Sequence, residues 1–577
     1  MGAWRRASAN EGGQCAGPRT GNRRGSLGGP CRTMSTVTPG DLTPSQRPAY
    51  EADEPRVLIL GGPGTGKTAL ALLMARRILE GQAPAPPKRV LFLTFSRSAT
   101  TELAKRAPDA LAGELGTRIE ISTFHAFAMT LLNGFRRFAG GSLEPLAILT
   151  REEEKLGLAA PGALTFDAIV PAALELLRNA PWLANSYRER YAAVICDEFQ
   201  DTTAPAAALL EELAGETQLI CLADADQVIF DWTDPTIARR IADYRASGAT
   251  VYDLGYDSRR DPSNVIPRAA AAIRERDYGS DAIADACRND RLRIVQYSAS
   301  EDGFDALVDL IREAQRGGAS QLGVFLATNR SVNDFAERLR AEEMEHEIIG
   351  LSGAAGEAQL AIAACARFVV GDGDWDEFLI ALGVFVTSCY RGTPPELAFG
   401  LVRDRELLEP GLITLLEAER DAFRALAGEP LEAFLGRAES FWRRLFRGRP
   451  RQLWELGTRD FRGQTLGLRG RPVDRSIAAA VTRLAQARRS VAWVDEITWP
   501  KAPISLMNVY QVKGREMDEV LLVHLSDDSD QWDPDGMRRL RRVHYVSMSR
   551  ARQRVTLVLP PHPKPFFAPY AGLCMVA

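Results

Sequence analysis

A glycine-rich run ends in lysine and threonine at residues 61–68 (GGPGTGKT), between an apolar run at 57–60 and a helical pattern. Its spacing is G-x-x-x-x-G-K-[ST], in the strand–loop–helix setting that this motif requires. Backbone N–H groups of such a loop surround phosphate oxygens, and the helix N-terminus adds partial positive charge. Lys67 would reach the β- and γ-phosphates of ATP, and the Thr68 hydroxyl would hold Mg²⁺. The predicted ATP-binding residues of this loop are Gly61, Gly62, Pro63, Gly64, Thr65, Gly66, Lys67 and Thr68.

Two carboxylates, Asp197 and Glu198, end a second apolar run at 193–196. In that position Asp197 would bind Mg²⁺, and Glu198 would orient or deprotonate the water that attacks the γ-phosphate. Taken alone, the pair is equally well explained as a solvated strand end. Together with the phosphate loop, it indicates a hydrolytic site. A third run, 219–223, is followed by Gln227, which could contact the γ-phosphate and respond to its loss.

These residues need a scaffold that brings the ends of separate apolar runs together. From about residue 42, short apolar runs alternate with helical patterns, which is typical of parallel sheets covered on both faces. We predict an α/β fold with two such blocks, each interrupted by a mostly helical insertion. The first block spans 42–250 with its insertion at about 126–188, and the second spans 251–365 and 501–577 around an insertion at 366–500.

The composition limits the class of protein. Hydrophobic residues make up 45 % of the 577-residue chain, yet no stretch reaches the roughly 18 consecutive apolar residues of a membrane span, and no signal-peptide core is present. We therefore expect a cytoplasmic protein without membrane contact. The eight cysteines form no C-x-x-C pair, which argues against a zinc ribbon or a thiol redox pair. Because the net charge is −4, a nucleic-acid partner would have to meet a local basic groove.

Residues 1–33 differ from the rest of the chain, since they contain six arginines, one acidic residue and almost nothing that could form a core. We expect residues 1–41 to be a disordered N-terminal extension. Transit peptides are also rich in arginine, but the amphipathic apolar face of such a peptide is missing here. Our hypothesis is that translation starts at Met34, which the intact mass of the natively expressed protein would test.

The order of these segments resembles the UvrD/Rep-like branch of superfamily 1 DNA helicases, over nearly the whole chain from residue 42. This resemblance implies two RecA-like P-loop domains with ATP and Mg²⁺ between them and no other cofactor. Four more segments carry it: 42–47 (LTPSQR), 254–260 (LGYDSRR), 510–516 (YQVKGRE) and 545–551 (YVSMSRA). The residues that it adds to the ATP site are Gln46 at the adenine, Arg259 at the γ-phosphate, Glu516 at the ribose and Arg550 as an arginine finger.

The same resemblance implies a path for single-stranded DNA. Segments 93–99 (LTFSRSA), 122–127 (STFHAF) and 223–232 (ADADQVIFDW) resemble the DNA-side motifs of the family. Tyr510 stands where histidine is frequent, and several other departures also lie on the DNA side. Core packing is an alternative role for Phe230 and Trp232. The predicted DNA contacts are Phe95, His125, Phe230, Trp232 and Tyr510.

Aromatic residues are interleaved with arginines in the stretch 442–471, which begins WRRLFRGRPR. The arginines could meet the phosphates of a DNA duplex ahead of a motor. A solvated helix face and loop explain the pattern equally well.

Three functions fit these motifs. The first is an ATP-dependent DNA helicase that moves 3′-to-5′ on single-stranded DNA and unwinds duplex junctions in DNA repair or replication. The second is a translocase with little unwinding of its own, which serves a partner nuclease or repair protein, for example in anti-phage defence. The third is an ATP-gated DNA sensor that binds without travelling. Strand displacement separates the first from the others, and ATP hydrolysis that depends on DNA length separates the second from the third.

Overall fold

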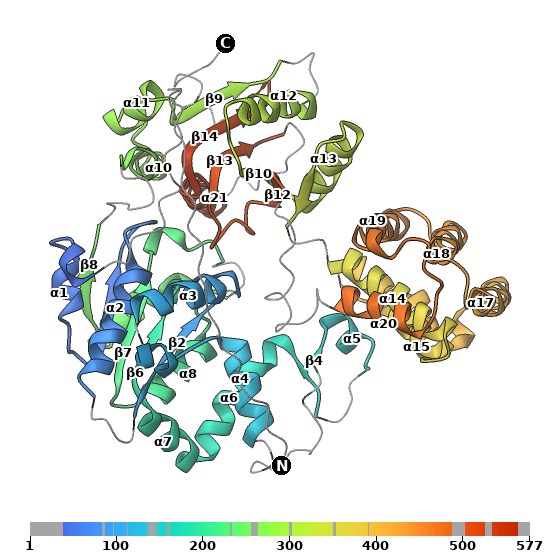
Figure 1. Cartoon of the computed structure of the whole chain (residues 1–577), viewed down its shortest axis with the longest axis horizontal. Coiled ribbons are helices and arrows are strands. Elements are labelled where there is room, and N and C mark those ends of the chain that lie inside the picture. The colour runs from blue at the N-terminus through green and yellow to red at the C-terminus, as the bar shows by residue number, and fades with distance from the viewer. Residues whose placement is uncertain are drawn as a thin grey trace, which may run out of the picture.

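Two six-stranded parallel sheets organise the chain in the computed structural model (Figure 1). The structure describes residues 38–82, 87–95, 97–111, 113–135, 137, 146, 148–158, 162–230, 234–255, 263–298, 303–349, 353–390, 392–486, 502–525, 534–562 and 570. The predicted N-terminal extension lies outside these residues except for 38–41, and so does the hypothetical start at Met34. Helices cover both faces of each sheet, so the predicted α/β fold with parallel sheets is confirmed.

The first sheet has the strand order β3-β2-β6-β7-β1-β8. Alternate residues of each strand enter two different cores: Val57 and Ile59 of β1 pack into one, and Leu58 packs into the other. Burial on both faces explains why each strand is a continuous apolar run in the sequence. The strands are β1 (Arg56–Leu60), β2 (Arg89–Thr94), β3 (Ile119–Thr123), β6 (Tyr191–Cys196), β7 (Gln218–Ala223) and β8 (Thr250–Asp253). Strand β8 thus extends slightly beyond the predicted block boundary at residue 250.

Helices fill both sides of this sheet. One side is covered by α1 (Gln46–Tyr50), α2 (Lys67–Glu80) and α3 (Arg97–Ala110). The other side is covered by α4 (Phe124–Phe135), α6 (Phe166–Asn179), α7 (Pro181–Arg190), α8 (Ala204–Ala214) and α9 (Arg240–Ala246). The region of the predicted small insertion also contains α5 (Arg151–Lys155) and a two-stranded sheet of β4 (Ile148–Leu149) and β5 (Leu164–Thr165).

The second sheet has the strand order β11-β12-β10-β13-β14-β9. Its strands are β9 (Leu292–Gln296), β10 (Leu322–Leu326), β11 (His346–Ile348), β12 (Ile504–Asn508), β13 (Met517–Val523) and β14 (Ala551–Leu559). One face packs against α12 (Gly303–Arg316) and α13 (Asn329–Ala341), and the other against α10 (Val265–Glu275), α11 (Asp281–Arg288) and α21 (Pro534–Met548). Because β12 to β14 follow a long helical region in the chain, the sheet is completed only after that region ends.

The helical region forms a separate body beside the two sheets (Figure 1). It consists of α14 (Gly353–Val369), α15 (Trp375–Ser388), α16 (Glu396–Val402), α17 (Pro410–Arg424), α18 (Leu431–Leu445), α19 (Arg449–Gln464) and α20 (Arg475–Gln486). Helix α14 begins before the predicted boundary near residue 366, and its alanine side chains pack into the core of the helical region. In the described part of the chain, no helix has the length and apolarity needed to cross a membrane.

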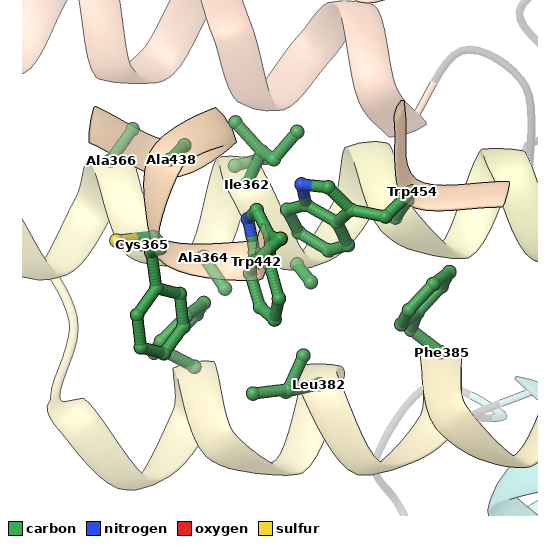
Figure 2. Packing of buried hydrophobic residues seen from close by; sticks show 14 of the residues in the cluster. Ile362, Ala364, Cys365, Ala366, Leu382, Phe385, Ala438, Trp442 and Trp454 are labelled. Carbon is green, nitrogen blue, oxygen red and sulfur yellow. The ribbon is translucent and has the colours of Figure 1, made fainter. Parts of the chain in front are cut away.

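Four aromatic residues of the stretch 442–471 form part of the core of this region. Trp442, Phe446, Trp454 and Phe461 are all buried. Figure 2 shows Trp442 and Trp454 side by side between the helices. Their ring centroids are 3.4 Å apart. Their helical spacing places the aromatics on the inner face of α18 and α19 and the arginines on the outer face. Among those arginines, Arg443 and Arg462 both pair with Glu439, and Arg444 pairs with Glu419.

Candidate active site

The phosphate loop leaves the carboxyl end of β1 and enters α2 at Lys67. Glycine is required at two points: Gly66 has φ +85°, and a Cβ on Gly61 would lie 2.7 Å from the Thr65 hydroxyl oxygen. Lys67 Nζ donates to the carbonyl oxygens of Gly61 (2.5 Å) and Gly62 (3.1 Å). The ammonium group therefore lies over the loop, where phosphate oxygens can replace these carbonyls as its partners.

The two predicted Mg²⁺ ligands, Thr68 and Asp197, are in contact. Thr68 Oγ1 donates to Asp197 Oδ2 at 3.0 Å. Burial and the charge of Glu198 raise the pKa of Asp197 to about 6, although Lys67 and Thr68 counteract them. In the described residues, no group of three His, Cys, Asp or Glu side chains is arranged to hold a metal ion. A hydroxyl and one carboxylate nevertheless fit Mg²⁺, which keeps several water and phosphate oxygens as ligands.

Glu198 adopts a left-handed conformation (φ +55°) between β6 and the short turn η4 (Phe199–Asp201). Its carboxylate accepts a hydrogen bond from Gln200 and lies 3.5 Å from Lys513 Nζ. Burial opposes the ionisation of Glu198, but the charges of Lys513 and Lys67 outweigh burial and hold the pKa of Glu198 below its usual value. Glu198 is therefore ionised at neutral pH and able to accept a proton from water.

Lys513 reaches this site from the second sheet, since it lies between β12 and β13. It forms an ion pair with Asp201, whose side chain is only 1 % exposed. Burial raises the pKa of Asp201 to about 6, and Lys513 counteracts this effect. Burial would also lower the pKa of Lys513, but Asp201 and Glu198 together hold it above its usual value. This ion pair links the two sheets. Removing either partner would leave an uncompensated buried charge.

Gln227 lies in the short turn η5 (Ala225–Gln227), directly after β7. Its Nε2 donates to Asp224 Oδ2 (2.8 Å), and its Oε1 accepts from Arg550 Nη2 (3.4 Å). Arg550 is buried at the junction of α21 and β14, where neighbouring oxygens of its own segment orient the guanidinium group. The structure therefore brings Gln227 and Arg550 together from opposite sheets.

A family model matches the part of the chain that carries these groups. The UvrD/REP helicase N-terminal domain matches residues 42–158 and 146–240, which include the phosphate loop, both acidic residues after β6 and Gln227. Residues 42–240 therefore resemble the UvrD/Rep-like helicase family. The shared motifs lie at the carboxyl edge of the first sheet, where parallel strands place ligand-binding residues.

Individual relatives of this UvrD/Rep-like chain are distant in sequence. The ATP-dependent DNA helicase UvrD1 of Mycobacterium tuberculosis is 25 % identical over 397 residues, which cover 54 % of this chain and 50 % of UvrD1. The chain thus spans about half the length of the mycobacterial relatives it matches. DNA helicase II of Escherichia coli is 23 % identical over 620 residues, which cover 89 % of this chain and 84 % of that protein. A solved Pif1 helicase from Candida albicans aligns with a TM-score of 0.26 at 15 % identity over 48 % of this chain and 54 % of that chain, too weakly to support an argument.

Three more residues are expected at ATP from the UvrD/Rep-like resemblance: Gln46, Glu516 and Arg259. Gln46 is buried, and its Nε2 donates to the Thr65 carbonyl oxygen of the phosphate loop at 2.7 Å. Glu516 lies at the start of β13 and pairs with Arg552 at 2.9 Å. Arg259 lies outside the described residues. Gln46 is therefore joined directly to the loop, whereas Glu516 contacts its own sheet.

Two of the predicted DNA contacts of this UvrD/Rep-like chain lie together where the sheets meet. Phe95, directly after β2, is 46 % exposed, and its ring lies 6.3 Å from that of Phe230 in a stacked orientation. Phe230 packs against the core of the second sheet, and Lys513 Nζ lies 6.0 Å from its ring centroid. The alternative role of core packing therefore applies to the side of Phe230 that faces the core of the second sheet. Trp232 lies outside the described residues.

His125 lies at the N-terminus of α4, and Phe166 stacks on its ring with centroids 3.8 Å apart. Burial lowers the pKa of His125, with Asp167 opposing the effect, so the ring is neutral at physiological pH. Phe166 is 44 % exposed, and it enlarges the aromatic surface that His125 offers. Tyr510 is half-buried and packs against the core of the second sheet.

The sequence interpretation missed three groups that complete the site: Lys513, Asp201 and Phe166. Lys513 lies in a loop, and no local pattern identifies the carboxylate that it meets in another domain. Asp201 closely follows the predicted pair Asp197 and Glu198 in the sequence, but only its burial separates it from an ordinary solvated aspartate. Phe166 had a usable signal, since it is an aromatic residue at the first position of an amphipathic helix.

Proposed function

We propose that this chain is an ATP-dependent motor that moves 3′-to-5′ along single-stranded DNA and unwinds duplex DNA during repair or replication. The observation that carries the proposal is the meeting of Lys513 and Arg550 with Glu198, Asp201 and Gln227 across two sheets, beside the ring pair Phe95–Phe230. The names of the relatives, which are DNA helicases, support the same activity.

Hydrolysis would depend on groups from both sheets. Lys67 would exchange its carbonyl partners for the β- and γ-phosphates, and Glu198 would take a proton from the attacking water. Thr68 and Asp197 would hold Mg²⁺, which neutralises phosphate charge when bound. Arg550 would approach the γ-phosphate only while the sheets are close, and such an arginine is typically worth ~10³–10⁵ in rate. Closure of the two sheets would thereby follow the nucleotide state.

The DNA strand would cross the rings beside the ATP site. Stacking of a base on an aromatic ring is worth about 1–3 kcal/mol and tolerates any sequence. Opening one base-pair step costs about 1.4 kcal/mol on average. A ring such as Phe95 could therefore hold one base about as strongly as one pair resists opening, which suits short steps along the strand.

Strand displacement tests this function and its polarity. Duplexes with a 3′ tail, a 5′ tail, blunt ends or a 3′ RNA tail are incubated with the protein, ATP and Mg²⁺. We expect displacement of the 3′-tailed DNA duplex above all others. Equal displacement of both tailed duplexes would contradict the polarity, and preference for the RNA tail would contradict the substrate class.

A translocase with little unwinding of its own, acting with a partner nuclease or repair protein, is the second candidate. The observation that favours it is the pairing of Arg443, Arg444 and Arg462 with glutamates, which leaves less unopposed charge to bind duplex phosphates. ATP hydrolysis that grows with the length of single-stranded DNA, without displacement of any duplex, would select this candidate.

A further inference from the structure

Residues 224–228 form the turn after β7. Each residue from Asp226 to Val228 contacts a cation of the second sheet or its helices. Arg274 of α10 forms an ion pair with Asp226. The Gln227 side chain accepts from Arg550, and the Gln227 carbonyl oxygen accepts from Lys513 Nζ at 3.1 Å. The remaining contact is from Arg542 of α21, whose Nη1 lies 3.3 Å from the Val228 carbonyl oxygen. Four cations from the second sheet and its helices thus hold one short turn of the first.

This turn is also the boundary between two hydrophobic cores. Strand β7 belongs to the first sheet, and Leu222 and Ala223 pack into its two cores. Only a few residues later, Ile229 is fully buried in the core of the second sheet, and Phe230 packs against the same core. When the two sheets move relative to each other, the turn cannot remain fixed to both. The contacts along 226–228 decide which sheet the turn follows.

Arg274 also has partners within the second domain, since it pairs with Glu275 beside it. It lies on α10, whose apolar face is buried against α21, and its guanidinium lies 5.6 Å from the ring centroid of Tyr545 on that helix. The side chains of Arg274 and Asp226 are 15 % and 19 % exposed, so solvent screens their attraction only partly. Unlike Lys513 and Arg550, this pair is separate from the groups proposed to act on the γ-phosphate.

We propose that Arg274 and Asp226 are a positioning pair that makes the Gln227 turn move with the second sheet, so that DNA bound beside Phe230 changes the rate of ATP hydrolysis. This inference rests on the proposed function, because it assigns the route by which DNA binding reaches the ATP site. It predicts that breaking the Arg274–Asp226 ion pair affects basal ATP hydrolysis and its stimulation by DNA differently. Basal hydrolysis persists, since no group at the phosphate is removed, while stimulation by DNA is lost.

The experiment measures ATP hydrolysis with and without a single-stranded oligonucleotide for the wild type, Arg274→Gln, Asp226→Asn and the charge-swapped double variant Arg274→Asp/Asp226→Arg. We expect unchanged basal kcat and KM for ATP in both single variants. The stimulation ratio should fall by roughly fivefold or more, the usual size of coupling between two sites. The charge swap should recover most of that ratio. The matched control is Arg288→Gln, which removes an exposed ion pair with Asp285 on the neighbouring helix α11 and should change nothing.

Each outcome separates this inference from the function on which it rests. A wild type whose hydrolysis ignores DNA overturns the proposed function. A stimulated wild type with fully stimulated single variants overturns the positioning pair and leaves the function standing. Loss of stimulation that the charge swap leaves unrepaired also overturns the pair, since it assigns the effect to the individual residues. If Arg274→Gln fails to fold, Asp226→Asn carries the same test from the first domain, with a thermal melt as the check on folding.

Discussion

The two sheets share one architecture but carry opposite charges where they meet. The first sheet places the carboxylates Asp197, Glu198 and Asp201 after β6, and burial raises the pKa of Asp197 and of Asp201 to about 6 each. The second sheet places Lys513 and Arg550 against them. We propose that the first sheet supplies the phosphate loop, Lys67 and the acids, and that the second sheet adds further positive charge. Under this proposal, contact between the sheets would be a condition for efficient hydrolysis.

Removing Arg550 should have the largest effect on ATP hydrolysis. Arg550→Ala should lower kcat for ATP by ~10³-fold or more, because the transition-state charge on the γ-phosphate would lose its cross-sheet partner. Steady-state ATP hydrolysis at saturating single-stranded DNA measures it. The control is Arg330→Ala, which changes an arginine with a 91 % exposed side chain on α13. A loss of kcat below tenfold would mean that the first sheet is sufficient for ATP hydrolysis without Arg550.

Lys513→Met should lower kcat at neutral pH by about tenfold and move the acid limb of kcat/KM to higher pH. The sign follows from the charges: Lys513 and Lys67 hold the pKa of Glu198 below its usual value against burial, so losing Lys513 raises that pKa. Protonation of Glu198 would then begin at a higher pH. Lys513→Arg keeps the charge and should leave the limb near its wild-type position. If the acid limb of kcat/KM stays at the same pH in Lys513→Met, Lys513 does not act on Glu198 in the hydrolytic site.

The requirement for Mg²⁺ should change with pH. Because Asp197 has a pKa of about 6 and its ionised form is the ligand, a proton competes with Mg²⁺ as the pH falls through 6. The Mg²⁺ concentration for half-maximal hydrolysis should rise by about tenfold per pH unit below that value. Titrations of Mg²⁺ at several pH values measure it. A half-maximal concentration that stays constant from pH 7 to pH 5 would contradict the role of Asp197.

The helical region should show the smallest effect on ATP hydrolysis. Arg447 and Arg469 lie on its exposed surface. Reversing both charges, Arg447→Glu and Arg469→Glu, should weaken binding to a single-strand–duplex junction by about threefold and leave ATP turnover on single strands unchanged. Fluorescence anisotropy with a labelled junction measures the binding. Equal losses of binding and turnover would show that the helical region also acts on the ATP site.

Much of the first sheet could be predicted from the sequence because its functional residues directly follow buried strands. An apolar run before Asp197 fixes where the strand ends, and parallel strands end at the same edge. The second sheet was less predictable, since Lys513 meets Asp201 through a contact between domains that no local pattern records. In the helical region, Trp442 and Phe446 lie beside arginines in sequence but are buried in space, so the sequence left the role of this stretch open. Their spacing of four residues was the signal for a buried stripe.

We propose that groups of the two sheets together form one DNA-responsive ATP site. The most direct test of this proposal is ATP hydrolysis without nucleic acid, with single-stranded DNA and with RNA of matched sequence, by the wild type and by Glu198→Gln. We expect strong stimulation by DNA in the wild type and no turnover in Glu198→Gln. Turnover that is the same with and without DNA, or that persists in Glu198→Gln, would contradict it.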